Sequence, residues 1–306
     1  MTKLKVGMIG LGSIAQKAYL PILSSNENWN FVGAYTPNEE KRHSICNQYR
    51  IRPFSNIKNL MDECDSVFVH SSTSTHYEIV SELLKNGKDV YVDKPLAESI
   101  EEAEKLVDLS LTYKRKLMVG FNRRFAPLYI EARKLMDNIA WTRIEKHRIN
   151  DISNCDYRVT MLDDYIHVVD LARWIGGDGT KLQTGIINAN PEDQLIYTQH
   201  AFNMEEGKQI FTGMHRNAGT GLEVFELVGE NRIVRVKDLQ MLEVEENGEL
   251  ITKTLGSWDT ILQGKGFVGA VHHFIESVLG DTEPMVNGQE GLKTQKLMEE
   301  MFNLKH

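Results

Sequence analysis

One segment of the chain places a carboxylate and an imidazole at a spacing that suits proton transfer. Asp163 and His167 lie four residues apart in a predicted helix, so both side chains fall on one face, with Asp170 three residues further on. A carboxylate beside an imidazole can orient the ring and stabilise its protonated form. When a secondary alcohol gives up a hydride, its hydroxyl proton must also leave, and histidine suits that task. We therefore expect His167 to be the acid/base and Asp163 to support it.

Each of these residues also has a plainer interpretation. Asp163 ends the segment 160–163, which matches a helix capping box with Asp in place of Glu. His167 could be a buried histidine satisfied by a neighbour. An Asp and a His at this spacing also suit a metal, but the sequence offers no clear third ligand.

Lys94 is the second candidate for chemistry, because it follows the short β-type run 89–92 and precedes Pro95. In an open α/β sheet the ligand lies outside the carboxyl ends of the strands. A lysine at that position points towards the reactive end of a bound cofactor and can polarise the reacting oxygen of a substrate. The alternative is a strand end held in a salt bridge.

The first strand pattern runs into a glycine-rich loop. Gly10 permits a tight turn, Gly12 lets the backbone approach a pyrophosphate, and Ala15 lets helix and strand pack closely. Ser13 and Ile14 complete this G-x-G-x-x-A fingerprint, which follows a strand and opens a helix. We expect the loop to bind a dinucleotide; the alternative is an ordinary glycine-rich turn.

The end of the second predicted strand bears on the choice of cofactor. An acid there would bind the ribose 2′-hydroxyl of NAD, but the chain has Thr36, with Lys41 and Arg42 about one turn later. Thr36 and Arg42 could contact a 2′-phosphate, so the sequence slightly favours NADP over NAD. The alternative is that Lys41 and Arg42 only solvate an exposed helix face.

Further polar residues follow later strands. Ser71, Ser72 and His76 are expected to line the pocket of the nicotinamide ribose. Asn122 and Arg123 lie at the crossover between the two halves of the chain, where we expect them to bind substrate.

The elements that position these residues alternate between strand and helix patterns over residues 1–121. This alternation predicts a dinucleotide-binding Rossmann domain with a doubly wound parallel sheet. The strands are expected at 5–9, 31–35, 66–70, 89–92 and 117–120, with helices such as 75–85 and 99–111 between them.

Residues 122–306 predict a substrate-binding and dimerisation α/β domain with a large, mostly antiparallel sheet. A helix over 163–175 ends at two glycines. No flexible linker separates the halves, so we expect them to pack with a cleft between them. The expected strands are 182–188, 194–202, 209–215, 223–228, 233–236 and 241–245, followed by helices at 268–279 and 288–302.

Composition narrows the class of protein. A chain that is 41% hydrophobic and 25% charged is typical of a soluble globular protein. The formal charge of −8 argues against nucleic acid or an anionic membrane as the main partner. The three cysteines form no CxxC, which suits a reducing cytosol. No run approaches the ~18 apolar residues of a membrane span, and we expect a cytoplasmic protein.

Several motifs together resemble the Gfo/Idh/MocA family of oxidoreductases, and the resemblance covers the whole chain. They are the glycine loop at 10–15, Asp93-Lys94-Pro95, the run 120–125 and Asp163-x-x-x-His167. Phrases such as 162–170 are similar to the MviM-like branch of this family, whose members have no assigned substrate.

The resemblance implies a Rossmann domain followed by an α/β domain whose sheet often forms a dimer interface. It implies that Lys94 contacts nicotinamide and substrate, that His167 is the acid/base supported by Asp163, and that the bond before Pro95 is cis. The chain departs from the family at Asp93, where Glu is usual, and in lacking the acid at position 36. Family substrates are mostly sugars, inositols and related polyols.

We therefore expect an NAD(P)-dependent oxidoreductase acting on a sugar-like or cyclitol-like secondary alcohol or its ketone, as a homodimer or homotetramer. The alternative is a non-catalytic sensor that binds a dinucleotide to regulate a partner. Retention of Lys94, Asp163 and His167 speaks against a sensor. A metal-dependent enzyme is a third alternative.

Overall fold

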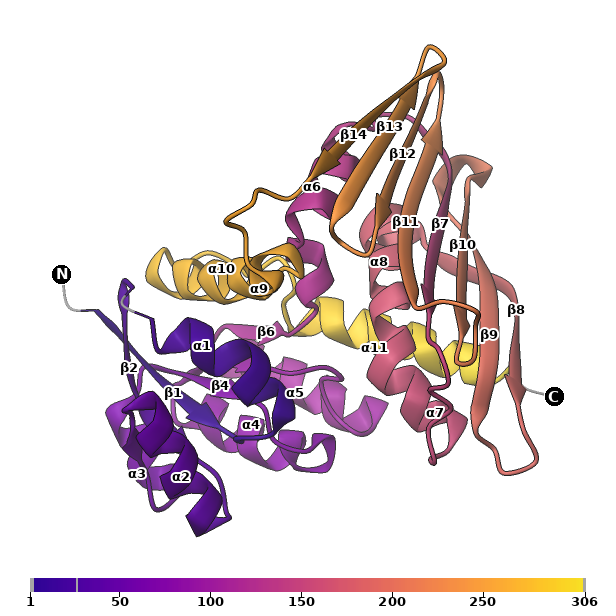
Figure 1. The fold of residues 1–306 in the computed structure, drawn as a ribbon. Coiled ribbons are helices and arrows are strands. Elements are labelled where there is room, and N and C mark those ends of the chain that lie inside the picture. Colours follow the sequence, from indigo (N-terminus) through magenta and orange to yellow (C-terminus); the bar gives the residue numbers. More distant parts are fainter. Residues whose placement is uncertain (1–2, 26, 305–306) are drawn as a thin grey trace. The chain divides into compact units, whose positions relative to one another are not determined.

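The computed structural model describes residues 3–25 and 27–304, which form two compact units. The first unit combines Met1–Phe121 with Phe267–Lys293, and the second combines Asn122–Gly266 with Thr294–His306. Each unit is built on its own sheet (Figure 1).

The first unit holds a six-stranded sheet in the order β3-β2-β1-β4-β5-β6, with every pair of neighbours parallel. Its strand β4 is buried throughout, which explains why it reads as a continuous apolar run. The predicted Rossmann fold is confirmed. The strands are β1 (Leu4–Ile9), β2 (Trp29–Tyr35), β3 (Arg52–Pro53), β4 (Ser66–Val69), β5 (Asp89–Val92) and β6 (Leu117–Val119).

Helices flank this sheet and connect its strands. They are α1 (Leu20–Leu23), α2 (Glu39–Tyr49), α3 (Ile57–Glu63), α4 (His76–Lys85) and α5 (Ile100–Tyr113), joined by α10 (Phe267–Leu279) from the end of the chain. The last helix, α11 (Gly288–Phe302), contributes residues to both units.

Helix α10 belongs to the first unit, whereas we expected all residues after 121 to form one domain. The Phe274 ring packs edge-on against Phe68 and Tyr91 of the first sheet, with centroid separations of 5.3 and 5.7 Å. Phe267 packs against Tyr19 in the same way at 5.5 Å. These buried aromatic contacts explain why the segment belongs to the first unit.

The second unit holds an eight-stranded, mostly antiparallel sheet in the order β14-β13-β12-β11-β7-β10-β9-β8. Only β7 and β10 pair in parallel. The expected large antiparallel sheet is confirmed. The strands are β7 (Ile139–His147), β8 (Lys181–Ala189), β9 (Leu195–Asn203), β10 (Gln209–His215), β11 (Leu222–Gly229), β12 (Arg232–Lys237), β13 (Met241–Glu246) and β14 (Glu249–Thr254).

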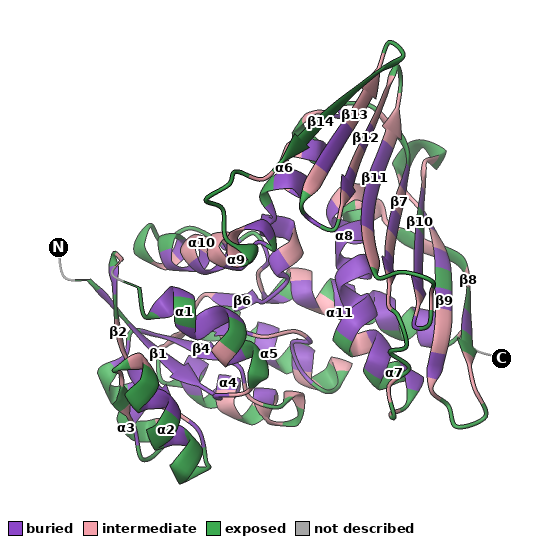
Figure 2. Cartoon of the chain, in the orientation of Figure 1, coloured by how far each residue is buried: buried purple, intermediate pink, exposed green. Residues whose placement is uncertain are grey.

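Two of these strands were not among the expected ones. All six residues of β14 are exposed, so this edge strand carries no buried side to mark it in the sequence (Figure 2). In β7, Thr142, Ile144 and Lys146 form the buried side. A threonine and a lysine in the core conceal the usual alternation of apolar and polar residues.

One face of the second sheet is covered by α6 (Pro127–Lys134) and α8 (Ile166–Gly176), which contact strands β7 and β10 to β13 (Figure 1). The short helices α7 (Tyr157–Thr160) and α9 (Ile261–Gly264) complete this unit. Within the described ranges, no helix is both long and apolar enough to cross a membrane.

Candidate active site

The glycine loop lies at the carboxyl end of β1. Gly10 has φ +92°, and a Cβ on it would come within 2.4 Å of the backbone of His70, so only glycine fits there. At Gly12 the nearest atom to such a Cβ is 3.9 Å away, so the protein itself leaves this backbone uncovered. Ser13 and Ile14 are exposed, and Ala15 is fully buried. This arrangement can admit a pyrophosphate beside the loop.

Three segments that could contact a ligand lie at one edge of the first sheet. Strands β1, β4 and β5 are parallel neighbours, so the segments that follow them, Gly10–Gly12, Ser71 and Lys94, emerge at the same edge. This edge is where open α/β sheets bind ligands.

His76 ties two of these segments together. Its Nδ1 lies 2.9 Å from the carbonyl oxygen of Pro95, and its Nε2 lies 3.2 Å from that of Ser71. Burial lowers the pKa of the ring. We had expected His76 to line the pocket of the nicotinamide ribose. Because both of its ring nitrogens instead face protein carbonyls, His76 holds the two loops together. The Lys94–Pro95 bond is cis, as the resemblance implied.

A buried polar network lies behind Lys94. The Asp93 carboxylate accepts the backbone N–H of Lys94 at 2.9 Å, and its other oxygen lies 4.0 Å from His70 Nδ1. The His70 ring stacks on Tyr19 at 3.8 Å, and Tyr19 shares a hydrogen bond with Tyr91 at 3.0 Å. Burial lowers the pKa of His70 to about 3, so its ring is neutral. Asp93, which stands where the family usually has Glu, thus positions the backbone of Lys94.

Arg42 lies at the carboxyl end of β2. Its Nη1 donates to the carbonyl oxygen of Thr36 at 2.8 Å, and its guanidinium lies 5.8 Å from the centre of the Tyr35 ring. Arg42 is only 7% exposed, so the view that it solvates a helix face is wrong, although Lys41 is exposed. A fixed cation therefore stands beside a strand end that carries no acid.

The helix of Asp163 and His167 is less regular than expected. It runs from Tyr157 to Gly176 and contains a π-helical turn, Met161–Tyr165. This turn shifts the expected regular spacing of Asp163 and His167 along one face. Asp163 is exposed and His167 is buried.

The capping-box interpretation of 160–163 is wrong. Thr160 has helical backbone angles and its side chain caps nothing. The helix instead begins after Asp156, whose side chain accepts the N–H of Arg158 at 2.7 Å. The alternative role for Asp163 as a helix cap is thereby removed.

Asp170 has a structural role in the second unit. Its carboxylate accepts two hydrogen bonds from Arg124, at 2.8 and 2.7 Å, and a third from the Thr294 hydroxyl at 3.0 Å. Both charged side chains are at most 4% exposed. A desolvated bidentate pair of this kind locks the helix to the segment that follows Phe121.

Sequence reasoning missed a cluster of buried charges centred on Asp164. This carboxylate accepts hydrogen bonds from Lys146 Nζ at 2.5 Å, from Arg148 at 2.9 Å twice, and from Arg216 at 2.6 Å. Asp164 lies three residues before His167 on the same helix. The cluster therefore adjoins the helix of the proposed acid/base.

Glu223 anchors the second part of this cluster. It lies opposite Lys146 in the β7–β11 pairing and accepts hydrogen bonds from Arg123, at 3.2 and 3.3 Å, and from the Tyr129 hydroxyl at 3.3 Å. Asn122 is buried and donates to the backbone of Lys265 at 2.8 Å. Of the two expected substrate residues, Arg123 thus lies in a charged cluster and Asn122 holds the neighbouring loop.

The mutual influence of these charges appears in their pKa values. Burial and the charge of Arg123 lower the pKa of Lys146 to about 8, although Glu223 and Asp164 favour its charged form. Burial alone would raise the pKa of Glu223, but Arg123 and Lys146 lower it to about 2. In the same way, Lys146 and Arg148 overcome burial and hold the pKa of Asp164 well below its usual range. Both carboxylates are therefore ionised at neutral pH.

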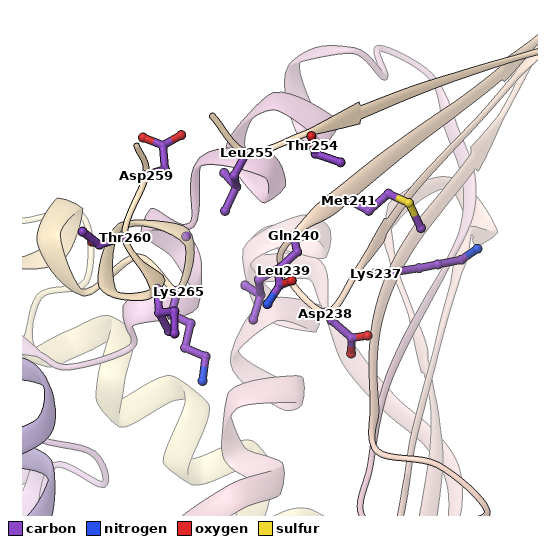
Figure 3. A pocket seen from close by; sticks show the side chains of 12 residues that line it. Lys237, Asp238, Leu239, Gln240, Met241, Thr254, Leu255, Asp259, Thr260 and Lys265 are labelled. Atoms are coloured by element: carbon purple, nitrogen blue, oxygen red, sulfur yellow. The ribbon is translucent and has the colours of Figure 1, made fainter. Parts of the chain in front are cut away.

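Two adjoining cavities of the second unit lie next to these charges. The smaller, which we call the basic cavity, has a volume of about 260 Å³, and its charged lining residues are Arg123, Lys146, Arg148, Lys265, Glu223 and Asp238. The larger has a volume of about 550 Å³ and lies between the turn at Leu239–Met241 and the segment Leu255–Lys265 (Figure 3). They share Asp238 to Gln240 and Lys265, so they adjoin.

A signal for this cluster was present in the sequence. Lys146 falls two residues after Ile144, and Glu223 two residues before Phe225, so a period-two pattern places both charges on the core side of their strands. A charge on the buried side of a strand needs an opposite charge nearby. Lys146 and Glu223 lie opposite each other and belong to the same cluster of buried charges. Within the described ranges, no group of three or more His, Cys, Asp or Glu residues is placed to hold a metal ion.

Comparison with known proteins gives matches over both units. Residues 4–121 match an oxidoreductase family with an NAD-binding Rossmann fold, and residues 127–247 match the YceM-like C-terminal domain. YceM of Salmonella typhimurium is 41% identical over 302 residues, which are 99% of this chain and 98% of that protein.

Two further matches extend over nearly the whole chain. The crystal structure of a dehydrogenase, MviM, from Clostridium difficile is 45% identical, with a TM-score of 0.96 over 98% of this chain and 99% of that one. An inositol 2-dehydrogenase of Rhizobium meliloti is 23% identical over 94% of this chain and 92% of its own length. The similarity therefore includes the second unit as well as the dinucleotide-binding part.

Proposed function

We propose that this chain, which belongs to the Gfo/Idh/MocA family of oxidoreductases, moves a hydride between a nicotinamide cofactor and a sugar-like or cyclitol-like secondary alcohol. The chain is an NAD(P)-dependent dehydrogenase. One observation carries the finer proposal: the glycine loop and Lys94 emerge at the same edge of the Rossmann sheet, after neighbouring parallel strands. A cyclitol-like substrate is supported by the inositol 2-dehydrogenase named above.

The residues that would hold the cofactor are those of the first unit. The uncovered backbone at Gly12 and the helix that starts at Ser13 suit a pyrophosphate, because helix N-termini favour negative charge. Ser71 and Ser72 stand at the end of β4 and would line the ribose next to the nicotinamide. A bound nicotinamide would accept or donate the hydride at its C4 atom.

The chain's own side chains supply the rest of the chemistry. Lys94 donates from Nζ to the reacting oxygen and stabilises the negative charge that develops on it. His167 accepts the hydroxyl proton during oxidation and returns it in the reverse direction. Asp163 is a positioning residue, which orients the His167 ring and stabilises its protonated form.

The test is a search for cofactor-dependent turnover. Purified protein is mixed with NADP or NAD and a panel of inositols, sugars and sugar acids, and absorbance of the reduced nicotinamide is followed. We expect turnover of at least one member. Tight dinucleotide binding without turnover of any member, in either direction, would favour the non-catalytic sensor instead.

Arg42 underlies our proposal that NADP is preferred to NAD. A buried guanidinium next to a strand end without an acid suits a 2′-phosphate. We predict that Arg42→Ala weakens NADPH binding by about tenfold or more, the effect of one charge-assisted hydrogen bond, and leaves NADH binding nearly unchanged. Fluorescence titration measures both affinities, with Lys41→Ala as the matched control. Equal losses for the two cofactors would refute this assignment.

We also propose that two copies pair through the uncovered face of the second sheet. Trp141, Ile186 and Phe211 are 39 to 47% exposed on three strands of that face. Apolar side chains gathered on one face favour association. We predict a particle of twice the 34.9 kDa chain mass or more by light scattering. A monomer at micromolar concentration would contradict the pairing.

A further inference from the structure

We propose that the substrate carries an anionic group, a carboxylate or a phosphate, and that this group binds in the basic cavity. The inference deepens the proposed function and rests on it, because it concerns the substrate of the same site. It is carried by the charge, burial and hydrogen bonding of the four cations that line the cavity: Arg123, Lys146, Arg148 and Lys265.

The lining of the basic cavity has an excess of positive charge. Four cations line the cavity with two carboxylates, Glu223 and Asp238, and a third carboxylate, Asp164, accepts from Lys146 and Arg148. Four cations against three carboxylates leave one positive charge in excess. The adjoining larger cavity offers a comparison within the same unit, because its two lysines, Lys237 and Lys265, are balanced by Asp238 and Asp259. The preference for an anion is therefore confined to the smaller cavity.

Two of the four cations are largely removed from water, whereas the side chain of Arg148 is 41% exposed and Lys265 is exposed. The side chain of Lys146 is 5% exposed and that of Arg123 is 11% exposed. Burying a cation costs free energy unless an opposite charge compensates it. The neighbouring carboxylates compensate in part, yet the pKa of Lys146 is still lowered to about 8. An anion in the cavity would favour the charged form of Lys146.

Donors remain open towards this cavity. Arg148 uses Nε and Nη2 on Asp164, and the hydrogen bonds of Lys265 to Asn122 and Ile261 use its backbone. Among the residues that the structure describes, Arg148 Nη1 and Lys265 Nζ have no hydrogen-bond partner. A neutral polyol needs no such set of cations, whereas a carboxylate or phosphate accepts from several of them at once.

The basic cavity is connected through Asp164 to the helix that carries His167, the proposed acid/base. Lys146 and Arg148 are bonded to Asp164, which lies three residues before His167 on one helix, and that helix packs on β7. A volume of about 260 Å³ is roughly what one end of a sugar-sized molecule needs, and is too small for a dinucleotide. The anionic group would thus be held by side chains that are bonded to the helix of the proposed acid/base.

The test compares sorbitol with two anionic probes, each of which differs from it at one terminal carbon: gluconate at C1 and sorbitol 6-phosphate at C6. Their binding to the full-length protein is measured by calorimetry, with and without saturating NADPH. We expect at least one anionic probe to bind tenfold or more tightly than sorbitol, the effect of about one charge-assisted contact. Preference for gluconate assigns the cavity to a carboxylate, and preference for sorbitol 6-phosphate assigns it to a phosphate.

Two variants localise the effect. Lys265→Met should weaken binding of the preferred anion about tenfold, since one charged contact is lost, without changing sorbitol or NADPH binding. Lys181→Met removes the charge of an exposed lysine on β8 and should change nothing. Lys265 is exposed, so its replacement should not affect folding, which a thermal melt verifies.

The outcomes separate this inference from the proposed function. Anion binding that depends on Lys265, without dehydrogenase turnover, would sustain the site and refute the enzyme. Turnover of neutral polyols with no advantage for gluconate or sorbitol 6-phosphate would refute the anion site and sustain the enzyme. Failure of both anions to bind more tightly than sorbitol, with NADPH present, also refutes the anion site.

Discussion

Replacing His167 with alanine is expected to lower kcat by about 10²- to 10⁴-fold, the usual contribution of a positioned general base. The variant should bind the dinucleotide as tightly as the native protein, because the residues proposed to hold the cofactor all belong to the first unit. His167 belongs to the second unit, on the helix that also carries Asp163 and Asp164. The change therefore removes a proton acceptor without touching the glycine loop.

Steady-state kinetics with the best substrate from the turnover panel measures this effect, and fluorescence titration measures cofactor affinity. His43→Ala is a matched control, since it removes a histidine whose side chain is 53% exposed on α2. The native enzyme should lose oxidation activity at low pH, where the general base is protonated, and the His167→Ala variant should lose that dependence.

Lys94→Ala should lower kcat as well, because charge on the reacting oxygen is no longer stabilised. Native-like turnover in both variants would refute the mechanism.

Asp170→Asn is expected to lower the free energy of unfolding by about 3–5 kcal/mol, because it leaves the Arg124 guanidinium buried without its counter-charge. The two side chains are 1% and 4% exposed, and the Thr294 hydroxyl also donates to the carboxylate. Neutralising the carboxylate weakens all three hydrogen bonds at once while the shape of the side chain is kept.

Urea unfolding followed by circular dichroism measures the loss. Asp178→Asn is the matched control, because Asp178 lies just beyond the same helix, 3.7 Å from Arg173, with its side chain 76% exposed. Exposed ion pairs contribute about 1 kcal/mol at most, so the control should change stability little. A small loss for Asp170→Asn together with a large drop in kcat would show that Asp170 acts in catalysis rather than in folding.

The Rossmann half could be read from the sequence because its signals are local. Strands such as β4 are buried on both faces and so appear as continuous apolar runs. The spacing of Gly10, Gly12 and Ala15 predicts the turn that follows β1. The cis bond before Pro95 followed from the resemblance. Elements without a local signal were missed, as with β14, which is exposed along its whole length.

Partners that are distant in the sequence could not be predicted. Helix α10 joins the first sheet because Phe274 finds Phe68 and Tyr91, more than 180 residues away along the chain. The sequence left open whether Arg42 contacts a 2′-phosphate or solvates a helix face, and only the fold showed that it is buried against the Thr36 carbonyl. The π-helical turn at Met161–Tyr165 likewise shows no mark in the pattern of apolar residues.

The sequence by itself determined the family, the dinucleotide loop and the identities of Lys94, Asp163 and His167 as candidates for chemistry, because each depends on short-range spacing. Only the tertiary structure decided which charges become neighbours. Lys146, Asp164 and Glu223 come from two strands and a helix, and they form one cluster because pairing of β7 with β11 and packing of α8 bring them together. Electrostatic interaction depends on distance through space and on burial, and spacing along the chain reports neither.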